Sequence, residues 1–269
     1  MKKLIVAIAA LAVLAGCGSK ESDEKHIKIG ATPTPHAEIL EQVKPVLEAE
    51  GYTVEIVQFT DYNTPNTALL DGSLDANFTQ HVPFLQNWAS EANASDKLTS
   101  VFAVHFEPLG IYSAKHTSIN DIVDGAKIAI PDDATNGGRA LKLLEANGII
   151  KLTDGIGIEA RKNDIIENKH NVEIIEMKAE ACATNLVDVD FAVVNGNNAL
   201  NAKIIDKVLI TEDKNSEAAQ TYANVIAVQT AHKDDEKIKA LVNALNSEDV
   251  KKFIDEKYNG LVVALVPTK

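Results

Sequence analysis

The chain has 269 residues, of which 45% are hydrophobic and 24% charged, a composition that supports a buried core and argues against a disordered chain. Its net charge of −13 argues against a nucleic-acid-binding protein, because phosphate contacts need clustered Lys and Arg. Two cysteines, Cys17 and Cys182, are too few for a disulfide scaffold or for a zinc site built from cysteines.

Residues 1–16 have the pattern of a secretion signal. Lys2 and Lys3 precede an uncharged apolar run at 4–14, which is too short to cross a bilayer core of about 30 Å as a helix. The run ends in LAGC at 14–17, which resembles a bacterial lipobox. We therefore expect a signal peptide at 1–16, then a lipid-modified Cys17 and a flexible polar tether that ends at residue 25. An ordinary secretory signal with an incidental cysteine is the alternative.

Past the tether, short β-rich runs alternate with helical patterns. In the first part of the chain we expect strands at 26–30, 54–59, 74–78 and 100–105 and helices at 37–50, 65–70 and 83–92. After Gly110 we expect strands at 127–130, 172–176 and 190–194 and a helix at 136–147. The remainder of the chain predicts a strand at 225–228 and two helices at 235–245 and 247–258.

This alternation predicts an α/β fold of parallel sheets with helices on both faces. Because the pattern restarts after Gly110, we expect two lobes, the first from 26–109 plus 223–269 and the second from 110–222. The chain would cross between them twice. Ligands bind at the carboxyl ends of strands in such sheets, so the loops that follow the strands are the candidate site.

Arg139 is the candidate anion-binding residue. It lies near the start of the predicted helix at 136–147, and Arg161 is the only other arginine among 26 basic residues. A guanidinium group offers two parallel donors to a carboxylate, and the amides of a helix start add more. We expect Arg139 to bind a ligand carboxylate, with a structural or surface arginine as the alternative.

Three asparagines, Asn136, Asn195 and Asn224, lie in loops next to predicted strand ends. A side-chain amide both donates and accepts hydrogen bonds, and a zwitterionic ligand needs donors for its carboxylate and acceptors for its ammonium. As a set they indicate a polar binding site, whereas a single asparagine is equally well explained by its preference for turns and caps.

Aromatic residues and histidines lie in the same loops. Tyr62 and Phe78 suit the walls of an apolar side-chain pocket, and His81 suits a hydrogen-bond donor in it. His36, His81 and His105 are an alternative metal-binding set, although no two have the spacing of a helical metal pair. The sequence contains no nucleophile elbow, P-loop or dinucleotide motif, so we expect a protein that is not an enzyme and needs no cofactor.

Eight short segments also carry a family resemblance. They are GATPTPHAEIL at 30–40, DYNTPN at 61–66, DANFTQH at 75–81, HFEPLG at 105–110, AIPD at 129–132, TNGGRA at 135–140, VVNGN at 193–197 and YANV at 222–225. In this order they resemble the methionine-binding lipoproteins of the NlpA family, which are the substrate-binding proteins of methionine ABC importers. The resemblance covers essentially the whole chain that would remain after signal cleavage.

The resemblance implies a two-lobed periplasmic-binding-protein fold of type II with the ligand in the cleft between the lobes. At matching positions it implies a binding set of Tyr62, Phe78, His81, Asn136, Arg139, Asn195 and Asn224. Within this set, the arginine would hold the carboxylate of an amino acid with the first asparagine close by, and the other two asparagines would hold its polar backbone end. The aromatic residues and the histidine would surround a thioether, which makes favourable contacts with rings.

The resemblance further implies a monomer, anchored by lipid on the extracytoplasmic face of the cell membrane, that delivers its ligand to an ABC permease. The chain departs from the family at Thr79, at Asn198 and in the segment 180–185. The ligand therefore stays open between L-methionine, D-methionine, a methionine-containing dipeptide and another amino acid. A metal-binding lipoprotein of an ABC importer and a surface lipoprotein without a transport role are the alternatives.

Overall fold

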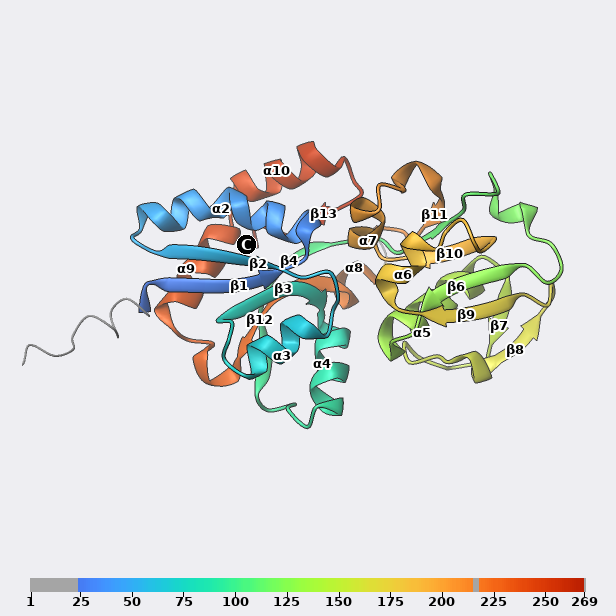
Figure 1. Ribbon diagram of the computed structural model, residues 1–269, viewed down its shortest axis with the longest axis horizontal. Helices are drawn as coiled ribbons and strands as arrows, with labels where there is room; N and C mark the ends of the chain where they lie inside the picture. The colour runs from blue at the N-terminus through green and yellow to red at the C-terminus, as the bar shows by residue number, and fades with distance from the viewer. Residues whose placement is uncertain (1–23, 215–217, 269) are drawn as a thin grey trace, which may run out of the picture.

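The computed structural model describes residues 24–214 and 218–268. The predicted signal peptide, the lipidation site Cys17 and nearly all of the predicted tether lie outside the described residues. Figure 1 shows two lobes side by side, each built around its own β-sheet. The prediction of a two-lobed α/β fold is therefore confirmed.

The first lobe contains a six-stranded sheet that takes its strands from both ends of the chain. From one edge to the other they are β13 (Val263–Ala264), β4 (Leu98–Phe106), β12 (Ala223–Gln229), β3 (Ala76–His81), β1 (His26–Ala31) and β2 (Thr53–Gln58). The helices of this lobe are η1 (Pro33–Ala37), α2 (Glu38–Ala49), α3 (Thr64–Leu70), α4 (Val82–Glu91), η5 (Thr230–His232), α9 (Glu236–Leu245) and α10 (Glu248–Tyr258).

The second lobe contains a five-stranded sheet and a separate two-stranded one. The larger sheet has the order β11 (Val208–Thr211), β5 (Gly110–Tyr112), β10 (Phe191–Val194), β6 (Lys127–Pro131) and β9 (Glu173–Met177), and the smaller pairs β7 (Ile150–Leu152) with β8 (Ile165–Asn168). Its helices are η2 (Ile119–Asp121), α5 (Ala134–Ala146), η3 (Lys162–Asp164), α6 (Ala179–Thr184), α7 (Gly196–Asn201) and η4 (Ile205–Lys207). The short helix α8 (Ala218–Thr221) precedes the return to the first lobe.

The expectation of purely parallel sheets is wrong. β1 pairs in parallel with β2 and β3, and β6 pairs in parallel with β9 and β10. However, β12 is antiparallel to both β3 and β4, and β5 is antiparallel to β10 and β11. The physical reason is the route of the chain, since β5 and β12 each enter their lobe from the other lobe and therefore run against their neighbours.

Each sheet forms a hydrophobic core with its helices. In α2 the buried residues Ile39, Leu40, Val43 and Leu47 recur at three- to four-residue spacing and form one apolar face. This face belongs to the same buried cluster as Ile29 of β1, which is fully inaccessible to solvent. A packed core under each sheet holds the strand-end loops in place, and these loops carry the predicted site residues.

The two segments that cross between the lobes are hydrogen-bonded to each other. The first joins β4 to β5 and contains Glu107 and Leu109, and the second follows β11 and contains Glu212. The Leu109 N–H donates to Oε2 of Glu212 at 2.9 Å, and the Glu212 N–H donates to the Leu109 carbonyl at 2.9 Å. This joint between the crossovers lies beside the pocket described below.

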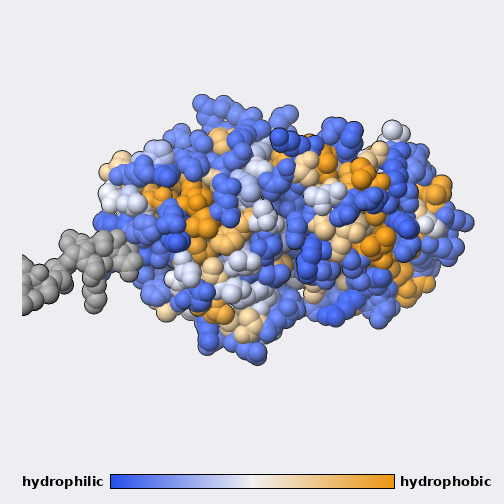
Figure 2. Space-filling view, viewed as in Figure 1, coloured by the Kyte–Doolittle hydropathy of each residue, from blue (hydrophilic) through white to orange (hydrophobic). Residues whose placement is uncertain are grey.

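Figure 2 shows a mainly hydrophilic face with smaller hydrophobic areas on both lobes. No helix within residues 24–214 and 218–268 is both long and apolar enough to cross a membrane.

Candidate ligand-binding site

A small pocket between the two lobes encloses a cavity of about 20 Å³. Its lining consists of Tyr62, Thr79, Gln80, His81, Phe84, Glu107, Asn136, Arg139, Asn195, Gly196, Asn197 and Asn224. The structure thus brings together six of the seven predicted site residues and leaves out Phe78. Most of the lining comes from strand ends and from the helix starts that follow them.

A wider groove with a cavity volume of about 400 Å³ lies between α4 and the second lobe. Trp88 of α4 lines one side, and Asp132 and Lys178 line the other. Tyr62 and Phe84 line both the groove and the inner pocket, so their rings lie between the two spaces.

Arg139 of α5 is 3% exposed, and its guanidinium group already has a carboxylate partner within the protein. Its Nε donates to Oε1 of Glu212 at 2.8 Å, and its Nη2 donates to the other oxygen of Glu212 and to the Glu107 carbonyl. Glu212 is not among the site residues predicted from the sequence. Because Glu212 takes the edge formed by Nε and Nη2, Nη1 is the nitrogen without a hydrogen-bond partner in the described residues.

His81 links the first lobe to the second as a neutral imidazole. It is the N-cap of α4, and its Nδ1 accepts a hydrogen bond from the Phe84 N–H at 3.2 Å. Its Nε2 therefore carries the proton and donates to Oδ1 of Asn136 at 3.1 Å. Burial, together with the nearby Arg139 charge, lowers the pKa of His81 to about 3, which keeps this donor neutral.

Asn136 is held by Asp133, the N-cap of α5. Oδ1 of Asp133 accepts from the Asn136 backbone N–H at 2.8 Å, and both carboxylate oxygens accept from its side-chain amide. Oδ1 of Asn136 then accepts from Nδ2 of Asn195 at 2.7 Å as well as from His81. Oδ1 of Asn195 is buried and has no hydrogen-bond partner in the described residues, so the pocket lining contains an acceptor that is free for a ligand.

Tyr62 forms a second polar link between the lobes. Its hydroxyl donates to Oδ1 of Asn197 at 2.6 Å and accepts from Nδ2 of Asn198 at 3.1 Å. Its ring lies edge-on to Phe84 with 5.7 Å between the ring centres. Tyr62 and His81 therefore hold the lobes together across the pocket in a closed arrangement.

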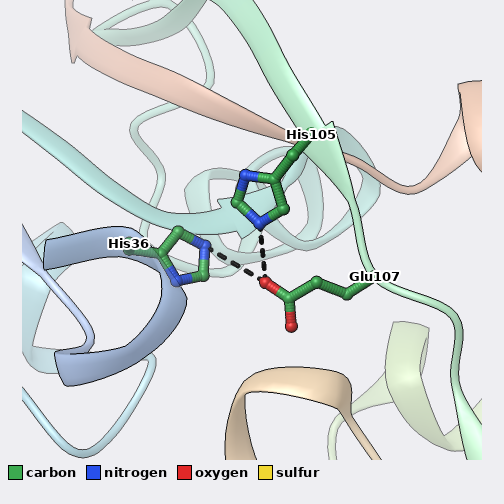
Figure 3. A group of neighbouring side chains, drawn as sticks. All are labelled: His36, His105 and Glu107. Atoms are coloured by element: carbon green, nitrogen blue, oxygen red, sulfur yellow. Dashed lines mark hydrogen bonds and ion pairs between the residues drawn. The ribbon is translucent and has the colours of Figure 1, made fainter. Parts of the chain in front are cut away.

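Figure 3 shows His36, His105 and Glu107 pointing toward one another. Nε2 of His105 lies 2.7 Å from Oε1 of Glu107, and Nε2 of His36 lies 3.6 Å from the same oxygen. His36 also bonds Thr32 through Nδ1 at 2.6 Å and Oδ1 of Asn224 through Nε2 at 3.0 Å. The three side chains are almost fully buried, and only Glu107 lines the pocket.

This geometry changes the set of residues that could bind a metal, which was His36, His81 and His105 in the prediction from the sequence. In the described residues, the possible ligand atoms of His36, His105 and Glu107 lie within 4.8 Å of one another, and His81 is not part of the group. Burial lowers the pKa of His36 to about 4 and that of His105 to about 3, and it raises the pKa of Glu107. The two imidazoles are therefore neutral near pH 7.

Phe78 does not line the pocket, contrary to the expectation that it forms a pocket wall. It is fully buried in the first-lobe core, with ring-centre distances of 4.5 Å to His36 and 5.2 Å to His105. Successive side chains of a strand point to opposite faces, and β3 is buried on both, so being in the right segment does not place a residue in the cleft. Phe78 supports the two histidines instead.

Seven residues at or beside the pocket were not among the predicted site residues. Six of them line the pocket (Thr79, Gln80, Phe84, Glu107, Gly196 and Asn197), and Glu212 binds Arg139 beside it. Glu107 follows the strand predicted at 100–105 and lies in the segment HFEPLG. Phe84 lies one helical turn after His81, and this spacing could have identified it. Asn197 follows Asn195 in the quoted segment VVNGN, whereas Glu212 lies in an acidic stretch without any distinguishing pattern.

The NlpA lipoprotein family model matches residues 27–266, and the chain belongs to this family. The chain is 38% identical over 275 residues to the methionine-binding lipoprotein MetQ of Bacillus subtilis, with 98% of each chain covered. It is 36% identical over 266 residues to the D-methionine-binding lipoprotein MetQ of Salmonella typhimurium, with 96% of each covered.

A solved structure extends the similarity to a ligand-bound protein. The nutrient-binding protein of Burkholderia cenocepacia bound to methionine is 39% identical and superposes with a TM-score of 0.83, covering 89% of this chain and 99% of the other. The family resemblance and the two-lobed fold expected from the sequence are therefore confirmed.

Proposed function

We propose that this protein binds L-methionine, or a close relative such as D-methionine or a methionine-containing dipeptide, and delivers it to the permease of an ABC importer. The observation that carries the proposal is the closed interlobe pocket, which is lined by polar groups from both lobes in a chain that the NlpA family model matches over residues 27–266. The names of the relatives as methionine-binding lipoproteins support the same ligand class.

In this proposal the ligand carboxylate binds near Nη1 of Arg139, which has no partner among the described residues. Asn195 and Asn224 bind the backbone end of the ligand, since the lining places an unpartnered amide oxygen of Asn195 there. The rings of Tyr62 and Phe84 contact the thioether, because sulfur makes favourable contacts with aromatic rings.

We further propose that the two lobes move as two bodies about the crossovers, the first lobe being residues 26–109 plus 223–269 and the second residues 110–222. The ligand favours the closed state because it contacts both lobes. The protein acts as a monomer held at the extracytoplasmic face of the membrane by lipid on Cys17. A purified Cys17→Ala variant is the matched control for the anchor, because it keeps the pocket and loses the lipid.

The direct test is mass spectrometry of the small molecules released when freshly purified protein is denatured, followed by thermal unfolding with added ligands. Methionine should be released and should raise the melting temperature in a concentration-dependent way, because a ligand that binds only the folded state stabilises it. Leucine serves as the control of similar size without sulfur. The absence of any shift with L-methionine, D-methionine and methionine dipeptides would rule out the proposal.

A Tyr62→Phe variant should bind methionine roughly 30-fold more weakly, mainly through faster release. The change removes two hydrogen bonds between the lobes, including the donor to Oδ1 of Asn197, at a cost of about 1 kcal/mol for each bond. Stopped-flow fluorescence gives the release rate. Tyr52→Phe is the matched control, because its hydroxyl donates to the Glu236 carbonyl within the first lobe, and it should leave the release rate unchanged.

A further inference from the structure

The charges around the pocket are not balanced. Arg139 is the pocket's cationic residue, and its charge is paired with Glu212, whose side chain is 11% exposed. The second carboxylate, Glu107, is 6% exposed and has no ion pair with Lys or Arg among the described residues. Its neighbours at ion-pair distance are the imidazoles of His36 and His105. Among the described residues, the closed pocket therefore contains a buried carboxylate that forms no ion pair with Lys or Arg.

Neutral donors hold this carboxylate in a fixed position. Nε2 of His105 donates to its Oε1, and the backbone N–H of Asn197 donates to the carboxylate as well. The Thr32 hydroxyl donates to Nδ1 of His36, which leaves the proton on Nε2, the nitrogen that faces Glu107 and Asn224. A carboxylate has about four acceptor positions, so Glu107 keeps capacity for a further donor.

We propose that Glu107 binds the α-ammonium group of the ligand and that this contact restricts the pocket to ligands with a free amine. The inference rests on the proposed function and adds to it the group that recognises the amine. A buried carboxylate without a cation is unfavourable, and a ligand ammonium removes that cost. Oδ1 of Asn195, which is unpartnered in the same lining, supplies a second acceptor for the ammonium protons.

His36 and His105 are positioning residues in this scheme. They contact Glu107 and not the pocket, and Phe78 packs against both rings from behind. Their role is to hold the carboxylate in position for the ligand ammonium.

The test combines one substitution with two truncated ligands. 4-(Methylthio)butanoate is methionine without its ammonium, and 3-(methylthio)propylamine is methionine without its carboxylate. Calorimetry of Glu107→Gln should show methionine and the amine bound about tenfold or more weakly than by the unmodified protein, because a hydrogen bond to a charged group is lost. The affinity for the butanoate should stay within roughly twofold, since this ligand has no ammonium group that could bind Glu107.

Glu236→Gln is the matched control, because its side chain is 84% exposed on α9, and it should leave all three affinities unchanged. Glu107→Asp keeps the charge and should keep the preference for ligands with an amine, which covers the case in which the glutamine variant folds poorly. An equal loss of affinity for all three ligands in Glu107→Gln would overturn the inference and leave methionine binding intact.

Elemental analysis of the purified protein separates the inference from a metal site. Stoichiometric zinc that is lost in Glu107→Gln would show that His36, His105 and Glu107 bind a cation of their own, and it would overturn the inference. Failure of the unmodified protein to bind methionine would instead overturn the proposed function itself.

Discussion

An Arg139→Ala variant is expected to bind methionine roughly 100-fold more weakly or not at all, because a charged donor to the ligand carboxylate is lost. Isothermal titration calorimetry measures this directly. Arg161→Ala is the matched control, since no side-chain hydrogen bond or ion pair of Arg161 is found in the described residues and its side chain is outside the inner pocket. Equal affinities of the two variants would show that Arg139 does not anchor the ligand.

The same substitution also affects folding, and a second change separates the two effects. Arg139→Ala leaves the carboxylate of Glu212 largely buried and without its partner, which costs about 3–5 kcal/mol when a buried ion pair is broken. Combining Arg139→Ala with Glu212→Gln removes the unpaired charge and should restore part of the melting temperature. Binding should not return in the double variant. If it does, the arginine has only a structural role.

A Gly138→Ala variant is expected to destabilise the second lobe by about 3 kcal/mol or more, the upper range for overpacking a tight site. A Cβ at this position would lie 2.1 Å from the Ile158 carbonyl oxygen and 3.0 Å from the Ala160 nitrogen. Both are backbone atoms that cannot turn away as a side chain does. Thermal unfolding followed by circular dichroism should show a melting temperature lower by roughly 6–12 °C.

Gly157→Ala is the control for the glycine prediction, because no atom lies within 4 Å of the Cβ it would add. It should change the free energy of unfolding by no more than about 0.5 kcal/mol. Gly138 directly precedes Arg139, so Gly138→Ala should also weaken methionine binding. Similar melting temperatures for the two alanine variants would mean that α5 is not packed closely against the segment at 158–160.

The longer elements of the fold could be predicted from the sequence because their hydrophobic period is long enough to read. The helix expected at 37–50 is α2 at Glu38–Ala49, and the one expected at 247–258 is α10 at Glu248–Tyr258. The short strands β5, β11 and β13 were not predicted. Strands of two to four residues are defined by their partners, and β5 pairs with β10 and β11, which lie about eighty or more residues away in sequence.

The location of the candidate site could be predicted from the sequence, whereas many of its contacts could not. The strand-end rule placed Tyr62, His81 and Arg139 in one cleft, and the structure brings them into one pocket. The rule could not show that Glu212 occupies one edge of the arginine, because that contact joins residues 73 positions apart. Nor could it show that Phe78 faces the core, since a strand buried on both faces has no alternation to read.

The hydrogen-bonded joint between the crossovers bears on the proposed opening of the cleft. Leu109 and Glu212 bind each other through two hydrogen bonds, so a change in the angle between the lobes that keeps both bonds moves the two segments as one. Arg139 is tied to this joint through Glu212, so in such a motion it stays close to the crossovers.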